Sequence, residues 1–111
     1  MGVDVELFRI EQLGTSPRRR RTVEVASVGD VHFHFAKVLE RAQHQGTTPM
    51  LDRIDLYGTL ELSHDEMPQL LAELSQLIAA SEGELEVLRA IRRLAESCQE
   101  ARELGLRFVG D

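Results

Sequence analysis

A helical hairpin over residues 63–105 is the feature that most constrains the fold of this chain. Ser63 and Glu66 have the S-x-x-E spacing of a capping box, in which each side chain satisfies a backbone N–H group of the other residue. Pro68 follows in the first turn, where a missing N–H group costs little. Apolar residues then recur at intervals of three and four, which predicts one apolar stripe along a helix. They are Leu70, Leu71, Leu74, Leu77 and Ile78.

A second apolar stripe follows a short interruption at residues 81–84. Gly83 lies in this interruption and can take the left-handed conformation that commonly ends a helix. The second stripe ends near Gly105 and consists of Leu85, Leu88, Ile91, Leu94, Ala95, Cys98 and Ala101. Two helices joined by so short a loop are expected to pack antiparallel, with their stripes facing a shared core.

Two strands are predicted near the N-terminus. Residues 3–12 are apolar on both faces, which indicates a buried or central strand. Residues 22–28 are rich in β-branched side chains and alternate, so a second strand, antiparallel to the first, is expected there. Gly14 and Pro17 mark the turn between the two strands.

The segment 31–45 has two interpretations. A tight turn at residues 29–30 would begin a third strand over residues 31–35. Alternatively, Asp30 caps a helix that stops at Gly46. We predict the helix, because its apolar pattern covers more residues and has suitable residues at both ends. Whether the segment is helical throughout or begins as a strand stays open.

The rest of the chain completes the predicted fold. Residues 50–62 read as extended chain, with Tyr57-Gly58 as a hairpin turn or a bulge, and residues 106–109 could add a small edge strand. We therefore predict a single α+β domain over residues 1–111. Its antiparallel sheet would have about four strands with helices on one face, in the order β-β-α-β-β-α-α, ending in the antiparallel helical hairpin.

Charge and cysteine content exclude several classes of function. The net charge is −6, and residues 23–111 alone carry −8. An acidic body argues against nucleic-acid binding, which needs clustered lysine and arginine. Cys98 is the single cysteine, so no internal disulfide can form and a reducing compartment is expected.

The chain also has no secretory signal at residues 1–6 and no apolar run of about 20 residues that could span a membrane. We expect a cytoplasmic protein with no membrane association. Lys37 is the only lysine among thirteen basic residues, and this preference for arginine is typical of GC-rich bacterial genomes.

His32 and His34 are the candidate metal ligands. On a strand, both side chains would lie on one face, with the spacing that lets two imidazoles bind one metal ion. On the preferred helix they would point about 200° apart and could not share a metal. A small metal- or ligand-binding enzyme that uses these histidines with Asp30 or Glu61 is therefore the alternative hypothesis.

The basic run Arg18, Arg19, Arg20 and Arg21 is the candidate partner-binding site. Guanidinium groups bind carboxylates and phosphates with planar pairs of donors. Aromatic side chains for base stacking are absent from this run, so an acidic protein surface is favoured over nucleic acid. A solvated loop with no partner is the simpler interpretation of such a run.

Three other groups lack the geometry for catalysis. Ser63-His64-Asp65 are consecutive at a helix start, so their side chains diverge and cannot form a triad. Asp52 and Asp55 have an odd offset, which places them on opposite faces of a strand. Cys98 lies on the apolar stripe, where a buried and inert thiol is expected.

These observations predict a small, non-catalytic protein without a cofactor. We expect it to bind another protein or a second copy of itself, in a protein-binding or regulatory role. Aromatic and aliphatic residues that the helices leave uncovered would suit such an interface; the candidates are Phe8, Ile10, Phe33 and Phe35. Small immunity or antitoxin-like proteins are one class of this size and build, although no motif connects the chain to them.

Overall fold

Three helices pack on a four-stranded sheet in this computed structural model, which describes residues 2–12 and 20–110. Three short 3-10 turns, at Val31–Phe33, Leu51–Arg53 and His64–Glu66, link the regular elements. The elements are β1 (Val3–Gln12), β2 (Arg20–Val28), α1 (His34–Ala42), β3 (Thr59–Ser63), α2 (Met67–Leu74), α3 (Glu82–Gln99) and β4 (Leu104–Gly110).

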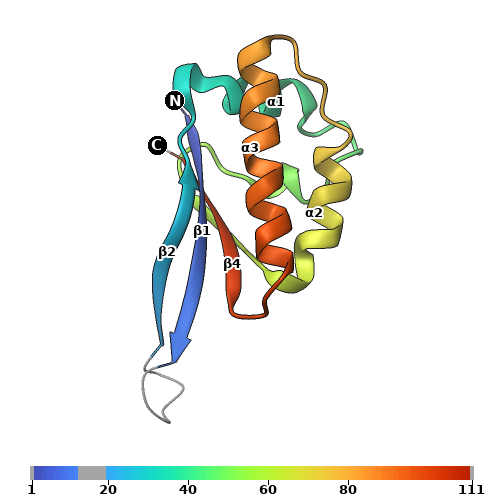
Figure 1. The fold of residues 1–111 in the computed structure, drawn as a ribbon. Helices are drawn as coiled ribbons and strands as arrows, with labels where there is room; N and C mark the ends of the chain where they lie inside the picture. Colours follow the sequence, from blue (N-terminus) through green and yellow to red (C-terminus); the bar gives the residue numbers. More distant parts are fainter. Residues whose placement is uncertain (1, 13–19, 111) are drawn as a thin grey trace.

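The sheet is antiparallel throughout and has the strand order β2-β1-β4-β3. The helices all lie on one of its faces, and α2 and α3 run antiparallel beside each other (Figure 1). The predicted α+β class, the four-stranded antiparallel sheet and the helical hairpin are confirmed.

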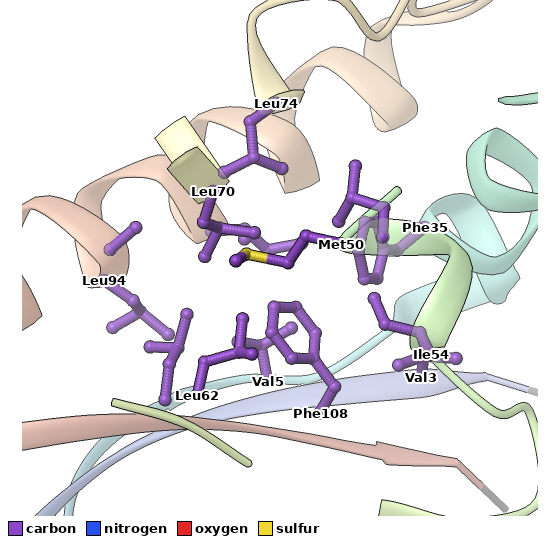
Figure 2. Close-up of a cluster of buried hydrophobic side chains, with 14 of the residues drawn as sticks. Val3, Val5, Phe35, Met50, Ile54, Leu62, Leu70, Leu74, Leu94 and Phe108 are labelled. Atoms are coloured by element: carbon purple, nitrogen blue, oxygen red, sulfur yellow. The ribbon is translucent and has the colours of Figure 1, made fainter. Parts of the chain in front are cut away.

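The core lies between the sheet and the helices (Figure 2). Alternate residues of β1 and β4 point into it, and Val5, Leu106 and Phe108 are fully buried there. Leu70 of α2 and Ile91 of α3 cover them from the helix side. Removing this apolar surface from water is the main force that joins the two layers.

Residues 50–62 contain one strand and not two. The structure places a 3-10 turn at Leu51–Arg53 and begins β3 only at Thr59. The physical reason is the buried carboxylate of Glu73, which accepts hydrogen bonds from the backbone N–H groups of Met50 at 3.0 Å and Leu51 at 2.9 Å. These amide groups therefore cannot join a strand ladder.

The C-terminal strand has a more central place than predicted. Residues 104–110 form β4, which pairs with β1 on one side and with β3 on the other. It was expected only as a small edge strand, because a short apolar run carries no information about its neighbours in a sheet. The observed order is therefore β-β-α-β-α-α-β.

The loop between α2 and α3 is longer than the sequence predicted. The α2 helix already ends at Leu74, so Ile78 lies outside it with 81% of its surface exposed. Gly83 does not close a helix but lies in the first turn of α3. Ser81 begins that helix, because its side-chain oxygen accepts a hydrogen bond from the N–H group of Glu84 at 3.2 Å.

The segment 31–45 is mainly helical, as predicted, with shifted boundaries. The α-helix begins at His34 and not at Val31, after a 3-10 turn, and ends at Ala42.

None of the helices in the described ranges is long and apolar enough to cross a membrane.

Replacing Glu73 with alanine should lower the free energy of unfolding by about 3 kcal/mol, because two buried N–H groups lose their acceptor. Urea denaturation measures this change. Glu96→Ala on the exposed face of α3 is the control, and it should change stability by less than about 0.5 kcal/mol. Equal effects of the two substitutions would contradict the proposed role of Glu73.

Candidate functional site

The 3-10 turn that joins β2 to α1 has an unusual backbone. His32 and Phe33, adjacent and neither of them glycine, have positive φ angles of 55° and 60°. This left-handed conformation costs about 1–2 kcal/mol for a residue with a side chain. Of the apolar side chains in this turn, Val31 is 63% exposed and Phe33 is 49% exposed. The turn therefore presents two apolar side chains to solvent on a strained backbone.

The buried carboxylate of Asp30 holds this turn in place. Its Oδ1 accepts a hydrogen bond from the N–H group of Phe35 at 2.7 Å, and its Oδ2 accepts from Ala36 at 3.0 Å and Val3 at 2.9 Å. The backbone N–H group of Asp30 donates to the side chain of Asp4 at 2.8 Å. The N-cap position of α1 is Phe33 and not Asp30 as predicted, but the Asp30 side chain satisfies N–H groups in the first turn of α1 and ties the helix to the start of β1.

A hollow of about 420 Å³ lies beside the turn, between it and α3. Val31, His32 and His34 line it from the turn, and Gly83 and Val87 line it from the helix. A Cβ atom at position 83 would overlap Nε2 of His34, so a larger residue would force the ring to move. The Nδ1 atom of His34 is buried without a hydrogen-bond partner among the described residues.

The two histidines proposed as metal ligands are near each other but lack a further ligand. Their ring centroids are 5.9 Å apart, since the left-handed turn brings both rings to one side. Asp30 uses both oxygens for backbone N–H groups, and Glu61 pairs with Arg107 at 2.7 Å. Within residues 2–12 and 20–110, no group of three or more metal-ligating side chains is found.

The predicted basic site is described only in part. Arg18 and Arg19 lie outside the described residues, and Arg20 is the first residue of β2. Arg21 follows it and forms an ion pair with Glu11 on β1, with 2.8 Å between Nη2 and the carboxylate oxygen. This pair is exposed and contributes little to stability.

Arg107 occupies the sheet face opposite the helices. Its guanidinium lies 4.5 Å from the ring centroid of Phe8 and bonds to Glu61 at 2.7 Å and Glu6 at 3.2 Å. Burial lowers the pKa of Arg107, but the hydrogen bonds to Glu61 and Glu6 outweigh burial and raise it. Arg107 and its two partners therefore cover Phe8, which is only 5% exposed although it lies on the helix-free face.

A shallow groove of about 500 Å³ borders this network. Ile10 and Leu104 contribute apolar surface, and Arg102 and His64 contribute polar groups. The Nδ1 atom of His64 is 3.1 Å from the backbone oxygen of Cys98. This arrangement has no nucleophile activated by a base, and it does not suggest a reaction.

The remaining candidate residues have structural roles. Ser63 and Glu66 form the predicted capping box. The side chains of Asp52 and Asp55 accept hydrogen bonds from the N–H groups of His44 and Tyr57, both at 2.9 Å, and so stabilise turns.

Cys98 is fully buried, and burial raises the pKa of its thiol to about 11. A thiol with this pKa is almost entirely protonated at neutral pH, which makes it a poor nucleophile.

The structure separates the four residues expected as a possible apolar patch. Phe8 and Phe35 are buried, whereas Ile10 and Phe33 are partly exposed on different parts of the molecule. Sequence reasoning named Phe33 as an interface candidate but missed the exposed turn that it forms with Val31, since the alternation of these residues with the histidines resembles a strand and Val31 alone also fits a helical stripe. The only local signal was the failure of either pattern to fit the whole segment.

Comparison of the chain with protein-family models, with curated proteins and with solved structures finds no match. The site must therefore be interpreted from its own geometry.

Glycine at position 32 should stabilise the protein, because it relieves the left-handed strain at an exposed residue. We expect His32→Gly to raise the free energy of unfolding by about 0.5–1 kcal/mol after the entropy cost of glycine in the unfolded chain. Lys37→Gly, at an exposed position inside α1, should instead lower it by about 1 kcal/mol. Urea denaturation distinguishes the two signs, and destabilisation by both would show that the turn is not strained.

Glu84 should make stability depend on pH. A side-chain hydrogen bond from Arg41 and a backbone hydrogen bond from Ala80 hold the pKa of Glu84 below its usual value of 4.5. A lowered pKa stabilises the fold above the unfolded-state value, and this contribution is lost as the pH falls through the folded-state pKa. The free energy of unfolding should therefore decrease below about pH 4.5.

Glu84→Gln should reduce this decrease, and the exposed control Glu96→Gln should preserve it. Urea denaturation at a series of pH values from about 3 to about 7, the range in which carboxyl groups titrate, measures the pH dependence of both variants. Identical pH profiles for the wild type and Glu84→Gln would contradict the assignment.

Proposed function

We propose that this protein is a non-catalytic, cytoplasmic domain that binds another protein through Val31 and Phe33. The observation that carries the proposal is the exposure of these two apolar side chains on a backbone with two adjacent left-handed residues. Strained backbone of this kind concentrates at functional sites, because glycine would remove its cost wherever the side chain is not needed.

The free-energy cost of the left-handed backbone is a substantial fraction of the stability of a domain. Two left-handed residues together cost about 2–4 kcal/mol, against a total stability of about 5–15 kcal/mol for a domain. Phe33 also leaves about half of its surface in water, so burial in the core returns only part of that cost. Binding to a partner would bury the exposed half of the Phe33 ring, and this would explain why a phenylalanine and not a glycine occupies the position.

Rigidity favours binding as well. Asp30 fixes the turn through three backbone hydrogen bonds between 2.7 and 3.0 Å. A turn held in this way loses little conformational freedom when it binds, which strengthens an interface without any added contact. Aromatic side chains in such positions are typical anchors of protein interfaces.

The chemistry of the surface indicates its partner. The exposed aromatic ring would enter an apolar pocket of the partner protein, and the hollow beside the turn would receive one of the partner's side chains. The acidic net charge of −6 argues against nucleic acid as this partner. A small protein that acts only by covering a surface of its partner needs no catalytic group.

The proposal can be tested with two double variants used as bait in lysate of the host organism. Val31→Ser/Phe33→Ser removes the exposed pair, and Tyr57→Ser/Ile78→Ser removes two large apolar side chains elsewhere that are more exposed than this pair. We expect a specific protein whose recovery falls by about tenfold or more with the first bait and is unchanged with the second. Quantitative mass spectrometry measures the recovery.

A photo-reactive residue at position 33 should then cross-link to the same protein, whereas one at position 78 should not. The proposal is wrong if both baits recover the same proteins in equal amounts, or if the cross-link forms equally from both positions. Thermal unfolding of each variant confirms that the baits are folded.

A further inference from the structure

The β2 strand is an open edge of the sheet. It pairs with β1 on one side only, and no element of the described ranges lies along its other side (Figure 1). The opposite edge, β3, has only five residues, whereas β2 has nine. A long edge strand offers unpaired N–H and C=O groups to a further strand.

A bulge limits the part of β2 that can pair regularly. Leu7 faces Ala26 and the next residue, Phe8, faces Glu24, so Val25 is an extra residue in the ladder. Bulges bend a strand and end regular pairing. The longer regular part of this edge is therefore the stretch Arg20–Glu24, which has Thr22 at its centre.

The sequence of this stretch is Arg-Arg-Thr-Val-Glu, basic at one end and acidic at the other. An antiparallel pair of identical strands about a two-fold axis places each residue opposite its mirror position. With the axis at Thr22, position 20 is opposite Glu24 in both halves of the pair. With the axis at Arg21, two arginines face each other, and with the axis at Val23 no opposite charges meet.

We propose that two copies of this chain associate through β2, antiparallel and centred on Thr22, to form one continuous eight-stranded sheet. Opposite charges at facing positions of antiparallel strands stabilise the pairing, and this register twice places position 20, an arginine in the sequence, opposite Glu24. Glu24 is exposed and has no ion-pair partner among the described residues. This surface is separate from the turn at Val31 and Phe33, so the proposal does not depend on the proposed function.

Thr22 and Glu24 pair with Ile10 and Phe8, so their side chains lie on the helix-free face. Residues that face each other in antiparallel strands point to the same face, so both copies would keep their helices on the same side of the joined sheet. The bodies of the two copies would extend from opposite ends of the shared stretch, because the start of β2 projects beyond the helices and its end lies beside them (Figure 1). A contact along this short stretch of one strand buries less surface than a standard protein interface, so the dimer should be weak and its population should depend on protein concentration.

Charge reversal tests the pairing. We expect Glu24→Arg to weaken dimerisation by about tenfold or more, because it replaces two attractive pairs by two repulsive ones. The charge swap Arg20→Glu/Glu24→Arg should restore the dimer. Glu96→Arg on α3 makes the same change in net charge away from β2 and should leave it intact. Sedimentation equilibrium over a range of concentrations measures each dissociation constant.

Disulfide cross-linking tests the register. A cysteine at position 22 would lie opposite the same cysteine of the second copy, within the reach of a disulfide. A cysteine at position 27 lies beyond the bulge and has no such partner in this pairing. Under mild oxidation, Thr22→Cys should form a covalent dimer about tenfold faster than Ser27→Cys. Cys98 is buried and does not compete.

A monomer at all concentrations would overturn the proposal. Equal effects of Glu24→Arg and Glu96→Arg, failure of the charge swap to restore the dimer, or equal cross-linking from positions 22 and 27 would do the same.

Discussion

The carboxylate of Asp30 is the contact on which the arrangement of this fold depends. It joins the start of β1 to the first turn of α1 through backbone N–H groups that would otherwise be buried without a partner. Glu73 does the same for the turn after residue 49, and Glu84 for the end of the hairpin loop at Ala80. Buried carboxylates thus organise three irregular connections that neither a helix nor a strand ladder could satisfy.

The regular elements could be predicted because their patterns are local. The apolar stripe of α3 and the apolar run of β1 are visible in any window of about ten residues. Glu73 and Glu84 could not be recognised as buried, because an acidic residue on a helix normally faces solvent. Glu73 bonds to Leu51, 22 residues away, and Glu84 bonds to Arg41, 43 residues away, and only the folded chain brings these partners together.

The candidate site was harder to predict for a related reason. Left-handed backbone at His32 and Phe33 has no sequence signal, since the residue that normally marks it is glycine. The burial of Phe8 was equally hard to predict, because it depends on Arg107 of β4 and on its ion-pair partners Glu6 of β1 and Glu61 of β3. This cover reduces the apolar surface that the helix-free face of the sheet exposes to solvent.

The central place of β4 determines when the protein can fold. Residues 104–110 must insert between β1 and β3, and β1 lies about a hundred residues earlier in the chain. Contacts of such high sequence separation slow folding, because a long loop must close before they contribute any stability. During synthesis, the hairpin of β1 and β2 and the helices can form early, but their apolar faces stay unmatched until β4 has left the ribosome. The sheet can therefore be completed only in a late step, once β4 has been synthesised.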